Sequence, residues 1–270
     1  MEHLRSINTS LECTRALYQD VFTQEQKRLE GALWLEKRTS LHVLGQELKP
    51  ASRVLDLGCA AGVYALPLAR SGHSVLAVDL VDHHIQSLKE QLEPGMALEA
   101  QVLDAQSAVD MQADASFDAV LCLGPMYHLV TEQERVQLLE GCLRVVKPGG
   151  KVFLSFINND WVIATMTLDN GEDTSYITMG DYDKASFRCK DFPFVFHTLS
   201  QAQAEIERAG LQISRRINSD GLNELFRCQF AAFSPQEKDA WFAYHLNLCE
   251  QPHHLGACNH WLFVCERTSI

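Results

Sequence analysis

Carboxylates stand at the ends of three successive apolar runs in the first half of the chain. Asp56 interrupts the run VLDL, Asp79 ends the run SVLAVD and Asp104 follows the run EAQVL. If these runs are parallel strands of an open α/β sheet, the carboxylates lie near the edge at which such sheets bind ligands. A carboxylate at that edge can accept hydrogen bonds from the vicinal hydroxyls of a ribose. The pattern therefore predicts a site for a ligand that contains a ribose.

The turn after the first run contains two glycines, in the stretch DLGCAAGVY. Gly58 and Gly62 allow the backbone to turn tightly and to approach a ligand closely. A dinucleotide fingerprint, G-x-G-x-x-G, would need glycines at 58, 60 and 63, but Ala60 and Val63 occupy two of these positions. A nicotinamide oxidoreductase would share the expected topology, so it remains an alternative that the turn disfavours.

Four segments in order along the chain extend this pattern: residues 53–80, VLDAQS at 102–107, FDAVLCLGPMYHL at 117–129 and LRVVKPGGKVFLSF at 143–156. Together they resemble the class I S-adenosylmethionine-dependent methyltransferases, and GPMYHL resembles the motif of a small-molecule subgroup with GPxYHL. The resemblance implies that S-adenosylmethionine is the cofactor. It also implies that the loop 56–62 packs against the methionine part, that Asp79 holds the ribose, and that Asp104 and Ala105 meet the adenine. The cofactor-binding residues implied are Asp56, Gly58, Cys59, Ala60, Gly62, Asp79, Leu80, Asp104, Ala105 and Leu123.

The order of the elements predicts an α/β fold with a parallel, doubly wound sheet, because strands and helices alternate from 53 to 157. The resemblance implies a Rossmann-like sheet of seven strands in which strand seven is antiparallel. It divides the chain into an N-terminal helical lid (1–48), a cofactor-binding core (49–157), an inserted substrate cap (158–197) and the C-terminal part of the core (198–270).

Helices are expected at 10–22 and 23–48, and by the resemblance they close over the cofactor. The candidates for lining the site from this lid are Tyr18, Arg28, Glu36 and Thr39. A solvated helix face with ordinary surface charges is the alternative for each of them.

Later elements have clear end signals. Thr131 with Glu134 forms a capping box before a helix whose expected buried stripe is Val136, Leu139, Leu143 and Val146. A helix at 200–209 is expected to begin at Ser200 with Gln203, and the last strand to cover 261–267. The cap at 158–197 shows no long helical pattern and is rich in aromatic residues, so it is interpreted as facing the substrate; packing that excludes solvent is the alternative.

Methyl transfer from a sulfonium is a displacement with an activated leaving group, so the protein has to align the reactants and exclude water. The loop 124–129 is expected beside the methyl group. Tyr127 and His128 are therefore predicted to contact the substrate, with His128 as a candidate base, and His197 is a second candidate. A histidine in a loop is often a structural hydrogen-bonding group instead, and Tyr127 can simply shape the pocket.

Composition excludes some classes of function. The chain has 270 residues, 46% hydrophobic and 21% charged, as in an ordinary globular protein, and a formal charge of −12. That charge disfavours a nucleic-acid partner. Nine cysteines without a disulfide framework indicate reduced thiols and a cytoplasmic location, and no apolar run reaches membrane-spanning length. No oligomeric state is predicted from the sequence.

Histidines and cysteines crowd the C-terminal region and suggest a zinc site: His245, Cys249, His253, His254, Cys258 and His260. Their spacing fits no paired-ligand pattern, so no metal is predicted. The sequence as a whole predicts an S-adenosylmethionine-dependent methyltransferase that acts on a small molecule. The alternatives are a module that binds the cofactor without turnover and an RNA-modifying methyltransferase, which the acidic balance disfavours.

Overall fold

A computed structural model describes residues 9–20, 34–168, 182–190 and 194–267 of the chain. The expected helix start at Thr23 and the lid candidate Arg28 lie outside these residues. Among the described helices, none combines the length and the apolar character needed to cross a membrane.

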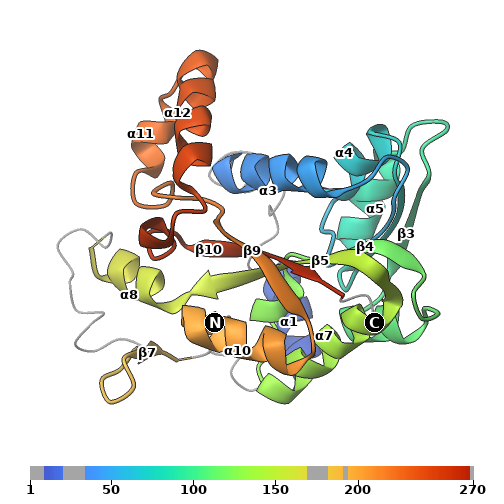
Figure 1. The fold of residues 1–270 in the computed structure, drawn as a ribbon, viewed down its shortest axis with the longest axis horizontal. Helices are drawn as coiled ribbons and strands as arrows, with labels where there is room; N and C mark the ends of the chain where they lie inside the picture. The colour runs from blue at the N-terminus through green and yellow to red at the C-terminus, as the bar shows by residue number, and fades with distance from the viewer. Residues whose placement is uncertain (1–8, 21–33, 169–181, 191–193, 268–270) are drawn as a thin grey trace.

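The centre of the molecule is one sheet (Figure 1). Its strands, in spatial order, are β3 (Leu98–Val102), β2 (Ser74–Asp79), β1 (Arg53–Leu57), β4 (Phe117–Cys122), β5 (Val146–Asn158), β10 (His260–Glu266) and β9 (Gln212–Asn218). The first five strands are parallel, and β10 runs antiparallel to both β5 and β9. The short strand β8 (Phe196–His197) also pairs with β5, and β6 (Tyr182–Asp183) forms a separate hairpin with β7 (Arg188–Cys189). The predicted Rossmann-like sheet with an antiparallel seventh strand is confirmed.

Helices connect the strands and cover both faces of the sheet. They are α1 (Ser10–Asp20), α3 (Trp34–Glu47), α4 (Ala65–Arg70), α5 (Asp82–Glu90), α6 (Ala105–Asp110), α7 (Glu132–Val145), α8 (Asn159–Leu168), α10 (Leu199–Arg208), α11 (Arg227–Ala231) and α12 (Pro235–Leu248). Two short 3₁₀ helices, η2 (Pro125–Tyr127) and η3 (Pro252–His254), complete the set among the described residues. Figure 1 shows α3 on the opposite side of the sheet from α7 and α10.

Alternating side chains of the strands divide the interior into two cores. In β1, Leu55 and Leu57 pack with α6, α7 and α10, whereas Val54 packs with α3, α4 and α5. The alternation continues in β4, where Val120 and Leu121 lie in different cores. Because both faces are covered, the buried side chains of β1, β4 and β5 are apolar apart from Asp56, Ser155 and Asn158.

Local sequence signals explain where most helices begin. Pro67 lies in the first turn of α4, where its missing N–H is harmless, and Gly72, with φ of 88°, follows the helix end. The capping box of Thr131 and Glu134 is present at α7. The expected start of α10 at Ser200 is wrong by two residues, because the same signature occurs earlier, in Thr198 and Gln201.

Two further expectations were incomplete. Of the expected buried stripe of α7, Leu139 and Val146 are buried, and Val136 and Leu143 are partly buried against the same core. The buried face also contains Leu138, Cys142 and Val145, together with Arg135, which pairs with Glu205. In the cap segment, the ten-residue helix α8 forms where no long helix was expected.

Helix α1 lies across the carboxyl edge of the sheet and is attached to the loop before α7. Ser10 Oγ donates to a carboxylate oxygen of Glu134 at 3.2 Å and accepts from the backbone N–H of Val130 at 3.1 Å. Leu17 is fully buried and packs near Phe194. These contacts place α1 over the ends of the parallel strands.

The glycines give a stability prediction with internal controls. Gly62 has φ of 89°, and a Cβ there would lie 2.4 Å from Leu88 Cδ1, so Gly62→Ala combines backbone strain with overpacking. We expect a loss of about 2–4 kcal/mol in the free energy of unfolding. Gly72→Ala has the same backbone strain in open space and should cost about 1 kcal/mol, whereas Gly45→Ala, in the exposed interior of α3, should stabilise by about 0.5–1 kcal/mol. Urea unfolding of the three variants checks this order; equal effects at Gly62 and Gly72 would contradict it.

Candidate active site

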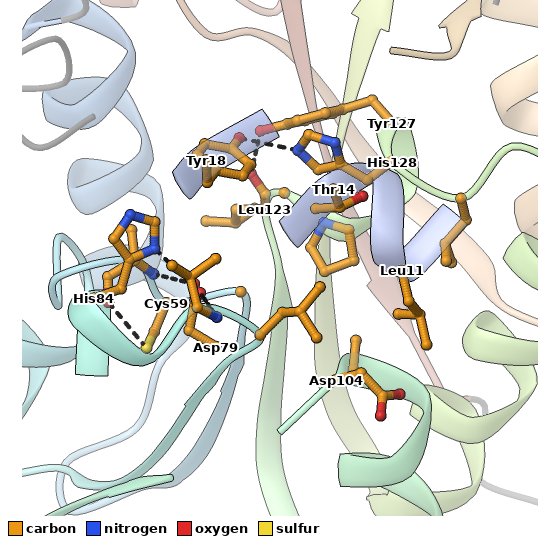
Figure 2. A pocket seen from close by; sticks show the side chains of 18 of the residues that line it. Leu11, Thr14, Tyr18, Cys59, Asp79, His84, Asp104, Leu123, Tyr127 and His128 are labelled. Carbon is orange, nitrogen blue, oxygen red and sulfur yellow. Dashed lines mark hydrogen bonds and ion pairs between the residues drawn. The ribbon is translucent and has the colours of Figure 1, made fainter. Parts of the chain in front are cut away.

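A cavity of about 320 Å³ opens at the carboxyl edge of the parallel strands, below α1 (Figure 2). Its walls are the loop after β1, the ends of β2 and β3, and the loop after β4. Of the residues predicted from the sequence, those that line it are Gly58, Cys59, Ala60, Asp79, Leu80, Asp104, Ala105, Leu123, Tyr127, His128, Tyr18 and Glu36. The volume is in the range of small-molecule sites.

Asp79 is held at the centre of one wall by hydrogen bonds from two loops. Its Oδ2 accepts from the backbone N–H of Ala60 at 2.8 Å, and its Oδ1 accepts from that of Val81 at 2.9 Å. His84 Nδ1 lies 3.1 Å from Oδ1. A carboxylate offers about four acceptor positions, so one remains on Oδ2 for a ligand hydroxyl.

The loop after β1 has three residues in the left-handed conformation: Gly58 (φ 73°), Ala60 (φ 46°) and Gly62 (φ 89°). The backbone N–H groups of Gly58 and Cys59 both donate to Val78 O, at 2.9 and 3.0 Å. A Cβ at Gly58 would lie 3.1 Å from Pro125 Cδ, so glycine allows the two loops to pack together. The left-handed turn therefore brings the loop after β1 against the loop after β4 at the wall of the cavity.

Asp104 lies at the end of β3 and also begins α6. Its Oδ1 accepts the backbone N–H of Ser107 at 2.8 Å, as expected of an N-cap. Asp104 and the adjoining Ala105 line the wall next to the Asp79 end of the cavity. One carboxylate thus serves the helix and still faces the cavity.

Asp56 and Gly62 were predicted with these residues, but neither is among the residues that line the cavity. Asp56 is 1% exposed and lies beneath the loop, where the backbone N–H of Ala65 hydrogen-bonds its carboxylate. Burial, reinforced by the charge of Asp79, raises the pKa of Asp56 to about 7. Its direct environment is the first turn of α4 rather than the cavity.

Tyr18 and His128 face each other at the end of the cavity opposite Asp79, as Figure 2 shows. The Tyr18 hydroxyl lies 3.0 Å from His128 Nε2, although the two residues are 110 positions apart in sequence. Tyr127 donates its hydroxyl to Leu123 O at 3.1 Å, and Phe194 of the cap segment contacts the rings of both Tyr127 and His128. The structure therefore brings together the loop after β4, helix α1 and part of the cap.

His197, the second candidate base, does not line the cavity and is 2% exposed. Its Nε2 lies 3.3 Å from Glu205, which also forms a bidentate pair with Arg135 at 2.8 and 2.6 Å. Arg135 donates in turn to the carbonyl oxygens of Leu129 and Val130. The environment of His197 is a buried ion-pair network that anchors the loop after β4. The lid candidate Thr39 is also fully buried away from the cavity.

His260 lines the cavity but was considered in the sequence only as a zinc ligand. Its Nδ1 lies 2.9 Å from Asp220 and 3.7 Å from Glu36. Among the described residues, these three side chains form the one group whose ligand atoms are close enough to share a metal ion, within 4.8 Å of one another. The other five members of the suggested zinc set do not join it. No metal is assigned, since Asp220 already accepts hydrogen bonds from protein groups with both oxygens.

The cavity is acidic: Glu36, Asp79, Asp104 and Glu134 line it, and no lysine or arginine does so among the residues that the structure describes. Sequence reasoning also missed His84, Tyr64 and the α1 residues Leu11 and Thr14. The position of His260 could have been found, because the first residue of an antiparallel strand lies at the carboxyl edge of its parallel neighbours. The α1 residues have no comparable sequence signal.

A family model described as a methyltransferase domain matches residues 54–150. The ubiquinone biosynthesis O-methyltransferase of Xanthomonas axonopodis pv. citri is 35% identical over 122 residues, which is 44% of this chain and 48% of that protein. The Pseudomonas aeruginosa protein of the same name is 30% identical over 128 residues, which is 47% of this chain and 50% of that protein. The chain spans about half the length of the curated relatives it matches.

Solved structures show the same fold over nearly the whole chain. Magnesium protoporphyrin IX methyltransferase from Synechocystis PCC 6803, with bound SAH, aligns with a TM-score of 0.59 and 13% identity, over 96% of this chain and 100% of that chain. A SAM-dependent methyltransferase from Archaeoglobus fulgidus aligns with a TM-score of 0.57 and 14% identity, over 92% of this chain and 100% of that chain. At such identities the likeness shows the fold.

Asp56 gives a prediction on the pH dependence of stability. Because its pKa in the folded chain lies above its ordinary value of 3.8, the folded chain holds an extra proton between about pH 4 and 7. The free energy of unfolding therefore falls as the pH rises through that window. We expect Asp56→Asn to remove this decline, so its advantage over wild type should grow by about 2–3 kcal/mol between about pH 5 and 7. Urea unfolding across this range is the measurement, and parallel curves for the two proteins would contradict the prediction.

Glu205 gives a prediction in which the free energy of unfolding depends on pH in the opposite direction. Burial raises its pKa, but hydrogen bonds from Arg135 and His197 outweigh burial and lower it to about 2. Its stabilisation is present above about pH 4.5 and is lost as the pH falls toward 2. We expect Glu205→Gln to lower the free energy of unfolding by about 3 kcal/mol at neutral pH, because it leaves the Arg135 charge buried. Glu132→Gln, which breaks the exposed Arg208 pair between the same two helices, should cost less than about 1 kcal/mol. Chemical unfolding that found equal costs would refute this.

Proposed function

We propose that this chain, whose residues 54–150 form a class I methyltransferase domain, transfers a methyl group from S-adenosylmethionine to a small-molecule acceptor. The observation that carries the proposal is the cavity at the carboxyl edge, where the ends of β1, β2, β3 and β4 converge within this domain. A module that binds the cofactor without turnover and an RNA-modifying enzyme have no specific observation in their favour.

The residues present fit the proposed cofactor. Asp79 keeps one acceptor position for a ribose hydroxyl, and Asp104 with Ala105 lies beside it for the adenine. The loop 58–62 brings backbone close to the cavity, as the methionine part requires. An acidic wall also suits a ligand that carries a sulfonium and an ammonium group. We therefore keep all the cofactor-binding residues predicted from the sequence. Asp56 and Gly62, which do not line the cavity, are proposed to act by shaping the loop after β1.

When bound, S-adenosylmethionine supplies a methyl group on an activated leaving group. The protein's own part is to bind the acceptor in line and to exclude water. We propose that Tyr127 and His128 contact the acceptor, with the His128 ring positioned by the Tyr18 hydroxyl at 3.0 Å. His128 is one candidate for the base that takes the acceptor's proton. Helix α1 covers this half of the cavity, and Phe194 packs behind His128.

The division of the chain follows from the same proposal. We propose residues 1–48 as a lid, 49–157 as the cofactor-binding core, 158–197 as a substrate cap and 198–270 as the remainder of the core. His197 then has an anchoring role through Glu205 rather than a catalytic one. All nine cysteines are unpaired, eight of them buried, which supports a reducing compartment such as the cytoplasm.

The proposal predicts that the two halves of the cavity can be separated by mutation. Asp79→Ala removes the ribose acceptor and should weaken binding of S-adenosylhomocysteine about ten- to a hundredfold. His128→Ala should leave that affinity nearly unchanged and lower kcat/KM once an acceptor is supplied. Isothermal titration of the two variants and wild type is the first measurement.

The acceptor can be found by incubating the protein and labelled S-adenosylmethionine with pools of small phenols, amines, thiols and carboxylates. Thermal unfolding of Asp79→Ala serves as a control, because this side chain also holds two backbone N–H groups. No binding of S-adenosylhomocysteine to wild type would refute the proposed function. If Asp79→Ala and His128→Ala lose the same affinity for S-adenosylhomocysteine, His128 contacts the cofactor and not the acceptor.

A further inference from the structure

We propose that His260, oriented by Asp220, takes the proton of the acceptor during methyl transfer, which makes His260 a catalytic residue and Asp220 a positioning residue. The inference rests on the function proposed above and deepens it, because it assigns the acid–base step to a particular side chain. It limits the acceptor to molecules whose reacting atom carries a proton, namely an alcohol or phenol, an amine or a thiol.

His260 lies on the side of the cavity that we propose for the acceptor. It is the first residue of β10, paired with Ile157 of β5, and it lines the cavity while being 4% exposed. Its ring centroid lies 6.1 Å from that of Tyr127, and Tyr127 also contacts His128. His260 is therefore on the β4 side of the cavity, away from the Asp79 and Asp104 wall.

The side chain of His260 is fixed before any ligand binds. Asp220 accepts the backbone N–H of His260 at 3.2 Å and that of Asn259 at 3.0 Å. Ser219 donates its hydroxyl to the carbonyl oxygen of His260 at 2.8 Å. These bonds clamp the backbone on both sides of the ring, so orientation of the imidazole costs little when the acceptor binds.

Asp220 also determines which nitrogen can act. A carboxylate can only accept a hydrogen bond, so the 2.9 Å contact places a proton on His260 Nδ1. In the neutral ring the basic lone pair is then on Nε2. This is the arrangement by which a carboxylate orients a histidine base and stabilises the imidazolium that forms.

The groups that face His260 include two carboxylates and a tyrosine ring. Asp220 and Glu36 both face His260 Nδ1, at 2.9 and 3.7 Å, and Tyr127 faces its ring. Beyond Asp220, burial lowers the pKa of His245 to about 4, and burial raises the pKa of the Cys258 thiol, so both stay neutral near pH 7. Carboxylates this close stabilise the imidazolium that forms when His260 takes a proton.

The proposed step is balanced. The acceptor's oxygen, nitrogen or sulfur forms a bond with the methyl carbon, and the carbon–sulfur bond breaks with its electron pair on sulfur. The acceptor's proton moves to His260 Nε2 and leaves to solvent after the product departs. The positive charge lost by the sulfonium is thus gained by an imidazole that Asp220 stabilises.

The first test is chemical modification with diethyl pyrocarbonate, which reacts with neutral imidazole nitrogens. Full-length protein saturated with S-adenosylhomocysteine would be treated across about pH 5–9, and each histidine quantified by mass spectrometry. His42 and His253, both exposed, serve as internal references. We expect His260 to react, with a half-maximal pH that falls by about one unit in Asp220→Asn and stays unchanged in His128→Gln. If His260 stays unmodified while the references react, or if Asp220→Asn has no effect on its profile, the proposal is wrong.

The second test uses turnover with an acceptor from the labelled-cofactor screen. We expect His260→Gln to lower kcat by about 10²–10⁴-fold with little change in KM, and to remove the acidic limb of the pH–rate profile. His128→Gln should act mainly on KM and keep that limb. A His260→Gln variant with wild-type kcat would overturn the proposal. Failure of S-adenosylhomocysteine to bind would refute the proposed function instead, and modification of the unliganded protein would still report on His260.

Discussion

The shape of the cavity depends on the hydrogen bonds that the Asp79 carboxylate accepts from the backbone. The carboxylate joins the loop after β1, through the N–H of Ala60, to the start of α5, through the N–H of Val81. The left-handed backbone of Ala60 costs about 1 kcal/mol, whereas a hydrogen bond to a charged group contributes about 1.5–3 kcal/mol. The hydrogen bond therefore outweighs the strain, and this explains why the loop keeps its shape without a glycine at position 60.

Much of the fold could be predicted because the signals are local. Alternating apolar runs, the capping box at Thr131 and the glycines at 58, 62 and 72 each determine the conformation of neighbouring residues. The site was harder to predict, because it depends on contacts between distant segments. Tyr18 meets His128 across 110 residues, and Asp220 meets His260 across 40. No spacing along the chain encodes such pairs. The burial of Arg135 in α7 has the same origin, since its partner Glu205 comes from α10.

The buried charges of this molecule fall into two kinds. Glu205 and Asp220 have their oxygens satisfied by donors, so they rigidify the parts of the chain that they join. Asp56 is different, because its Oδ2 has no hydrogen-bond partner among the described residues and a second carboxylate lies near. The satisfied carboxylates support the loop after β4 and the start of β10. The unsatisfied one lies under the glycine turn, where burial and the charge of Asp79 raise its pKa.

Helix α1 touches both ends of the cavity through one side chain. The Tyr18 ring packs edge-on against His84, beside Asp79, and its hydroxyl meets His128 at the other end. A ligand at either end that changes the position of Tyr18 must then alter the affinity of the other end. Thermodynamic linkage requires the two effects to be equal in size, so a single tyrosine can make occupancy by the proposed cofactor and the proposed acceptor cooperative.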